Sequence, residues 1–143
     1  MKVHQISVFL ENRAGQLAEI TSILAENGID LRAISIAETA DYGVLRMIVD
    51  DAEKATGILL SHGYILSMTP VTVIAVPDVP GGLAPALALL AEANIGIEYM
   101  YSLFTHKEGQ AYMVFRISDE EAFAKKLGEH GMHPVTKEEL GLK

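Results

Sequence analysis

Two short glycine-containing stretches have the residue types needed to bind a charged small molecule. They are Asn12–Leu17 (NRAGQL) and Asp78–Leu83 (DVPGGL), and each follows an apolar segment and precedes an amphipathic one. A helix that begins at such a turn offers N–H groups without intrahelical partners and a partial positive charge, and both attract anions. Gly15 and Gly81 allow a ligand to approach the backbone without meeting a Cβ atom.

The same stretches also carry acceptors for a cation. Asn12 and Asp78 have side-chain oxygens that accept from an ammonium group, and Asp30 supplies another acceptor at the start of a later strand. Donors for a carboxylate beside acceptors for an amine suit a free amino acid. The residue types leave a second interpretation open, because Asn12 and Asp78 also serve as helix caps or turn residues without any ligand.

The elements that position these turns occur twice in the chain. Aligning Gly15 with Gly81 also aligns several other identical residues, among them Leu17 with Leu83, Leu24 with Leu90, Ile29 with Ile95 and Met47 with Met113. Such self-similarity is typical of a duplicated structural unit. We therefore expect two domains, 1–69 and 70–143, with the boundary near Pro70.

Each copy is predicted to contain strand, helix, strand, strand, helix and strand in that order. β-Branched apolar runs predict the strands, and apolar residues at helical spacing predict the helices. The expected elements of the first copy are 3–10, a helix ending at Asn27, 29–38, 44–49, a helix from 50 to 62, and 64–68. Those of the second copy are 71–76, helix 81–93, 97–104, 111–117, helix 118–130 and 133–136, followed by a short helix opened by a capping box at Thr136.

This order predicts an α+β fold of two ferredoxin-like βαββαβ units, each an antiparallel sheet with both helices on one face, packed as a tandem pair. A unit of this size has a small core and exposed sheet edges. Pairing of the two copies within one chain is therefore expected.

Composition argues against several classes of function. The net charge is −8 with a pI near 5.0, which disfavours nucleic acid and anionic membrane surfaces as partners. The chain has no cysteine, so thiolate metal sites and thiol nucleophiles are excluded. His130 and His133 straddle a predicted helix end rather than sharing one face, so no metal or other cofactor is expected. The lack of cysteine fits a cytoplasmic protein, and with no acid–base constellation we expect a protein that is not an enzyme.

The two turns and the helix exits that follow them resemble the signature of ACT domains. That pattern is approximately D/N-R-P-G-x-L, followed by L-a-e-x-G-I-N-I. The chain matches it at 12–17 and 24–31 in the first copy, and at 79–83 and 90–97 in the second. The resemblance covers essentially the whole chain as a tandem pair.

Membership of this family implies small-molecule regulation, most often by an amino acid bound between paired domains. The turn residues that it implies as ligand contacts are Asn12, Ala14, Gly15, Gln16, Leu17, Asp78, Pro80, Gly81, Gly82 and Leu83. The second-strand residues that it implies are Asp30, Leu31, Gly96 and Ile97. Ala14 departs from the usual proline, Asp30 departs from the usual asparagine, and Gly96 has no polar side chain. The two sites are therefore expected to be unequal.

The resemblance favours a regulatory protein that binds a free amino acid and acts through another protein. The alternative is a docking subunit of an amino-acid biosynthetic enzyme, similar to the small subunit of acetolactate synthase. A homodimer is expected in either case, because a pair of such units still has sheet edges to cover.

Overall fold

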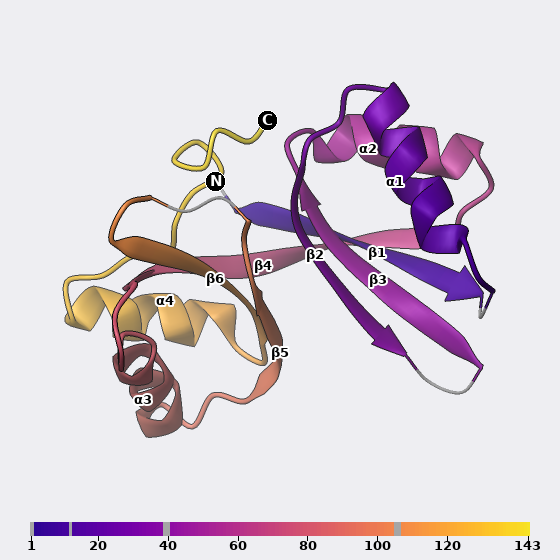
Figure 1. The fold of residues 1–143 in the computed structure, drawn as a ribbon. Helices are drawn as coiled ribbons and strands as arrows, with labels where there is room; N and C mark the ends of the chain where they lie inside the picture. Colours follow the sequence, from indigo (N-terminus) through magenta and orange to yellow (C-terminus); the bar gives the residue numbers. More distant parts are fainter. Residues whose placement is uncertain (1, 12, 39–40, 105–106) are drawn as a thin grey trace. The chain divides into compact units, whose positions relative to one another are not determined.

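The computed structural model describes residues 2–11, 13–38, 41–104 and 107–143. They form two compact units, which Figure 1 shows as two groups of strands and helices. The N-terminal unit contains residues 4–69 together with 141–143, and the C-terminal unit contains residues 70–140 together with 2–3. Each unit thus includes a few residues from the other end of the chain.

The elements follow the predicted order with one fusion. They are β1 (Val3–Glu11), α1 (Gln16–Glu26), β2 (Leu31–Glu38), β3 (Tyr42–Val49), α2 (Ala52–Ser61), β4 (Leu66–Pro77), α3 (Ala84–Glu92), β5 (Ile97–Ser102), β6 (Gln110–Ile117) and α4 (Glu120–Glu129). No helix in the described part of the chain is both long and apolar enough to cross a membrane.

The N-terminal unit has the strand arrangement that a ferredoxin-like fold requires. Its strands lie in the order β2-β3-β1-β4, and β3 runs antiparallel to both of its neighbours. Side chains alternate along these strands, so Ile6, Val8 and Leu10 all point toward the layer formed by α1 and α2. The α+β prediction is confirmed for this unit.

The C-terminal unit repeats this plan with the order β4-β6-β5 and helices α3 and α4. The predicted last strand, 133–136, is not a regular strand. One backbone hydrogen bond, from the Val135 N–H to the Val73 carbonyl (2.7 Å), occupies the expected place. Pro134 has no N–H to donate, which limits a regular ladder in such a short segment.

The prediction of two separate strands on either side of Pro70 was wrong. β4 runs without interruption from Leu66 to Pro77 and passes from the N-terminal to the C-terminal unit. Proline adopts extended backbone angles and also drives the preceding residue toward them. With no glycine between Leu66 and Pro77, nothing turns the chain at the domain boundary.

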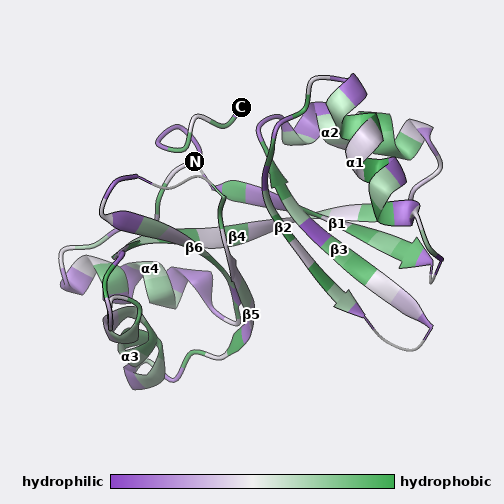
Figure 2. Ribbon diagram, in the orientation of Figure 1, coloured by the Kyte–Doolittle hydropathy of each residue, from purple (hydrophilic) through white to green (hydrophobic). Residues whose placement is uncertain are grey.

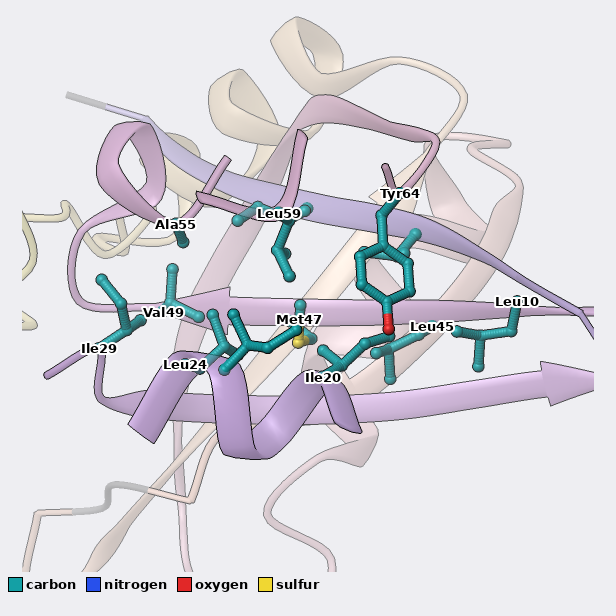
Figure 3. Close-up of a cluster of buried hydrophobic side chains, with 13 residues drawn as sticks. Leu10, Ile20, Leu24, Ile29, Leu45, Met47, Val49, Ala55, Leu59 and Tyr64 are labelled. Carbon is teal, nitrogen blue, oxygen red and sulfur yellow. The ribbon is translucent and has the colours of Figure 1, made fainter. Parts of the chain in front are cut away.

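Each unit has its own hydrophobic core between sheet and helices. In Figure 2 the hydrophobic positions on α1, α3 and the strands are green. Figure 3 shows the N-terminal core, where Ile20 and Leu24 from α1 face Leu45 and Met47 from β3. Phe115 and Phe123 are fully buried in the C-terminal core, with ring centroids 5.9 Å apart in an edge-to-face arrangement.

The chain end contains the predicted capping box but not the predicted helix. The Glu139 N–H donates to Thr136 Oγ1 (3.2 Å), and the Thr136 N–H donates to Glu139 Oε1 (3.3 Å). The turn closes once, with the Leu140 N–H donating to the Thr136 carbonyl, and Gly141 follows with φ +70°. A single hydrogen-bonded turn does not propagate into a helix.

Candidate functional site

The first strand–helix turn brings the start of α1 to the end of β1. The Arg13 N–H donates to the Glu11 carbonyl (2.8 Å), and Gly15 then takes φ +86° as the N-cap residue of α1. Such a φ is rarely adopted by residues with a side chain. Glycine has no oxygen with which to cap the helix, and no side-chain cap forms within the described residues. The first N–H groups of α1 are therefore left for another partner.

Gln16, the first residue of α1, has a buried amide with an unused acceptor. The residue is 7% exposed, and its Oε1 has no hydrogen-bond partner among the described residues. Leaving a buried polar atom unpaired costs about 1–3 kcal/mol. This acceptor lies beside an uncapped helix N-terminus and can accept a hydrogen bond from a donor placed there.

Two cavities meet at this point, with volumes of about 630 and 170 Å³. The residues that line both are Leu10, Glu11, Arg13, Gln16 and Tyr42. The larger cavity extends to the end of α2 and the start of β4, and the smaller one extends along the end of β2. The volume of the larger cavity lies in the range of small-molecule sites, about 300–1,000 Å³.

The Arg13 guanidinium is the cation of this site. It lies 3.7 Å from a carboxylate oxygen of Glu11 and 3.7 Å from one of Glu19, and its side chain is 51% exposed. Ion pairs that are this long and this exposed contribute little to stability. Arg13 can therefore turn toward a ligand carboxylate at small cost, and a carboxylate can accept two hydrogen bonds from a guanidinium group.

Tyr64 forms the inner wall of the larger cavity. It is 8% exposed, its ring packs in the core, and its hydroxyl points toward α1 in Figure 3. That hydroxyl donates a short hydrogen bond to Glu19 Oε1. Burial, followed by the hydrogen bond and the negative charge of Glu19, raises the pKa of Tyr64 to about 12. Tyr64 therefore stays neutral at physiological pH and fixes the Glu19 carboxylate.

The structure brings some of the predicted residues of the first copy together and separates others. Gly15, Gln16 and Leu17 line the smaller cavity, and Ala14 is exposed beside them. Asn12 lies outside the described residues.

Asp30 and Leu31 lie far from this turn within their own unit. Leu31 pairs with Val49 at one end of the sheet, whereas Glu38 pairs with Gly43 near the turn. Asp30 is engaged locally, because its carboxylate accepts from Arg32 Nε (2.8 Å) and its N–H donates to Asp50 Oδ1 (2.9 Å).

The matching turn in the C-terminal unit has a different conformation. A Cβ atom built on Gly82 would lie 1.9 Å from the Pro77 carbonyl oxygen, so the loop folds directly against its own backbone. The Gly82 N–H donates to the Val79 carbonyl (3.0 Å), and the Asp78 N–H donates to the Gly109 carbonyl (3.0 Å). Local partners thus occupy two of the N–H groups of this turn.

The prediction that the first helix of the second copy starts at Gly81 was wrong. α3 begins at Ala84 with Pro85 in its first turn, a position where proline is well tolerated. Gly81 and Pro80 are exposed and Leu83 is half-buried. Gly81 has a positive φ of +79°, close to the +86° of Gly15, but it is separated from the helix by Gly82 and Leu83.

Gly96 and Ile97 lie where β5 begins. The Gly96 N–H donates to Ser118 Oγ (3.1 Å), and Ile97 is 40% exposed. A cavity of about 710 Å³ in this unit is lined by neither of them and by none of the residues of the 78–83 turn. Within the described residues no group of three or more His, Asp or Glu side chains is arranged to hold a metal ion.

Sequence reasoning missed four residues of the N-terminal site: Arg13, Glu19, Tyr42 and Tyr64. Arg13 is part of the NRAGQL motif, so its place in the sequence was a signal for the site. Glu19 is one helical turn beyond Gly15, and its spacing also pointed to the site. Tyr42 and Tyr64 are contributed by β3 and by the segment before β4, and no local signal marks them.

Comparison with known proteins supports the resemblance inferred from the motifs. Residues 1–140 match the family described as the ACT domain pair. The chain therefore belongs to the ACT domain pair family. No match was found among curated protein sequences.

Several solved structures have a fold similar to that of this chain. Protein BT0572 from Bacteroides thetaiotaomicron is 38% identical, with a TM-score of 0.90 over 99% of this chain and 96% of that chain. The ligand-free regulatory subunit of aspartate kinase from Thermus thermophilus is 18% identical, with a TM-score of 0.66 over 90% of this chain and 93% of that one. The corresponding subunit from Thermus flavus is 17% identical, with a TM-score of 0.59 over the same shares, 90% and 93%. At identities of 18% and 17%, the similarity to the two Thermus subunits shows a shared fold and nothing more.

Proposed function

We propose that this protein is a regulatory protein that binds a free amino acid at the start of α1 in the N-terminal unit. The observation that carries the proposal is the buried, unpartnered Oε1 of Gln16 beside an uncapped helix N-terminus. A helix start alone does not define a ligand. A zwitterion needs donors for its carboxylate and an acceptor for its ammonium group, and the buried Oε1 next to the helix start supplies the acceptor.

The charged groups of an amino acid match the groups of this site. The α-carboxylate accepts from the first N–H groups of α1 and from Arg13. The ammonium group donates to Gln16 Oε1 and lies near the carboxylate of Glu11. The sequence led us to expect a ligand between paired units; this proposal requires residues of the N-terminal unit alone.

The ligand regulates by binding one conformation of the protein more tightly than another. We propose that ligand binding changes the interaction of this chain with an enzyme partner. In this proposal the chain itself binds the ligand and does not catalyse a reaction. Its likeness in fold to two aspartate kinase regulatory subunits is consistent with such a partner. We further propose that the chain forms a homodimer, which size-exclusion chromatography with light scattering will test.

The test is a thermal unfolding screen of the full chain with each standard amino acid at millimolar concentration. A ligand at 100 times its Kd stabilises the folded state by about 2.7 kcal/mol. We expect one amino acid, or a few related ones, to raise the Tm. Arg13→Gln should reduce the effect strongly.

Arg32→Gln is the matched control. It removes the same charge from the same unit, but at the opposite end of β2, where Arg32 pairs with Asp30. It should leave the ligand effect unchanged. A flat response to every amino acid, or equal losses in the two arginine variants, would contradict the proposal.

A further inference from the structure

The larger cavity of the N-terminal unit has an aromatic wall. Phe9 and Tyr42 line it with ring centroids 6.0 Å apart, and they are 51% and 47% exposed. Ile65, which is 70% exposed, lines the same cavity. Single exposed apolar residues are ordinary, but three that share one cavity mark a binding surface.

The strand register explains why these side chains meet. Phe9 is paired with Val44 and Glu11 with Tyr42, so Phe9 and Tyr42 are diagonal neighbours on adjacent antiparallel strands. The Phe9 N–H donates to the Ile65 carbonyl (2.9 Å), which holds the start of the β4 segment beside the wall. The backbone that carries these three side chains is therefore held by strand pairing and by this hydrogen bond.

Polar groups line another part of the same cavity. They are Arg13, Gln16 and the hydrogen-bonded pair of Glu19 and Tyr64. An apolar surface combined with a few convergent polar groups is typical of sites for amphipathic small molecules. Strand alternation places Phe9 and Tyr42 on the face of the sheet opposite Leu10 and the helices, so the aromatic surface and the polar groups of the cavity lie on different sides of β1.

The aromatic wall belongs to one copy of the repeat. At the positions that match Phe9 and Tyr42, the second copy has Ala75 and Glu108. Neither of these provides an aromatic surface. The wall is thus not a requirement of the duplicated fold.

We infer that this cavity selects an amino acid with a large apolar side chain, aromatic ones above all. The inference rests on the proposed function, because it assigns the zwitterion to Arg13, Gln16 and the α1 start. It adds that the ligand side chain packs on Phe9 and Tyr42. Aspartate and glutamate are disfavoured, because Glu11, Glu19 and Asp41 outnumber the single Arg13 in the lining.

The experiment is isothermal titration calorimetry of the full chain with L-phenylalanine, L-leucine, L-alanine, L-lysine and L-aspartate. We expect the Kd of phenylalanine to be at least about tenfold below that of alanine, with leucine between them. Phe9→Ser and Tyr42→Ser should each reduce the phenylalanine-to-alanine selectivity by about tenfold. Circular dichroism confirms folding, and either variant alone suffices for the test.

The control is Tyr99→Ser, which removes an aromatic side chain stacked on Tyr101 in the C-terminal unit. It should leave the selectivity unchanged. Tighter binding of lysine or alanine, or selectivity preserved in Phe9→Ser and Tyr42→Ser, overturns this inference and leaves the proposed amino-acid function standing. Failure of every amino acid to bind overturns both.

Discussion

The two glycine turns of this chain descend from one repeated motif but differ in structure. In the N-terminal unit Gly15 is itself the N-cap residue, and α1 begins at the next residue, Gln16. In the C-terminal unit Gly81 is followed by Gly82, and α3 begins only at Ala84. One turn leaves its helix start beside a cavity, and the other folds against the Pro77 carbonyl.

The difference is attributable to one position. Gln16 matches Gly82 in the repeat, and only a residue without a Cβ atom tolerates the close approach to Pro77. Glycine therefore permits closure of the second turn, whereas glutamine at the matching position supplies a buried amide. A repeated motif thus does not guarantee a repeated site, because a single side chain decides whether the turn closes.

The largest expected effect comes from forcing the closed turn open. Gly82→Ala places a methyl group against backbone, which cannot move aside easily, and we expect it to lower the free energy of unfolding by about 3 kcal/mol. Gly15→Ala meets no atom within 4 Å and adds only the strain of its positive φ, about 1–2 kcal/mol. Urea denaturation of both variants measures the difference. Equal losses would show that the two turns do not differ as described.

The second prediction removes the feature that distinguishes the open turn. Gln16→Met replaces an unsatisfied buried amide, and in the absence of ligand it should raise the free energy of unfolding by about 1 kcal/mol. The same variant should lose the stabilisation by amino acids.

Gln5→Met is its matched control. Gln5 is fully buried in the same unit, and its amide donates to Ser7 Oγ (3.0 Å). This variant should therefore lose about 1 kcal/mol, as measured by the same urea titration. Destabilisation of Gln16→Met to the same extent would mean that its amide is satisfied in solution.

A third prediction concerns pH and the Tyr64–Glu19 pair of the open site. The pKa of Tyr64 is raised from 10.0 in the unfolded chain to about 12 in the folded one. Its contribution to stability is therefore complete below pH 10 and decreases as pH rises toward 12, by at most about 2 kcal/mol. Tyr64→Phe has no phenol to ionise, so its stability should fall less over this interval. Parallel urea titrations at several pH values will show whether the two curves converge.

The smallest effect is expected in the C-terminal unit, where Glu139 ends the exposed capping box. Hydrogen bonds from Thr136 and the nearby His133 lower the pKa of this carboxyl from 4.5. Its stabilising contribution is therefore present above pH 4.5 and is lost as the pH falls through the lowered pKa. Glu139→Gln should reduce the Tm slightly at neutral pH and not at all in acid. A constant difference at every pH would argue against this role of the charge.

Local patterns were sufficient to predict most elements of the fold. Asp51 and Asp119 cap α2 and α4, where each side chain accepts from the N–H three residues ahead. The predicted strands and helices from residue 3 to residue 62 all occur in the structure within a few residues of their expected ends. The errors lie at β4, at the start of α3, at 133–136 and after Thr136, where a single turn replaces the predicted helix.

The candidate site was predictable in part. The motif identified Gly15, Gln16 and Leu17, because a helix start is encoded in contiguous residues. It did not identify Tyr64, which reaches Glu19 from a segment 45 residues away in sequence. It predicted unequal sites on the ground of Gly96 and not of the turns, since spacing does not report whether a Cβ atom has room.

The sequence by itself determined the duplication, the family and the order of strands and helices, because these depend on periodicity and on short-range turn chemistry. The tertiary structure alone decided which of the two turns stays open and which side chains surround it. The closed turn depends on the distance between Gly82 and the Pro77 carbonyl in the same loop, whereas side chains around the open turn, such as Tyr64, come from segments remote in sequence. The sequence does not show that a Cβ atom on Gly82 would lie 1.9 Å from the Pro77 carbonyl oxygen.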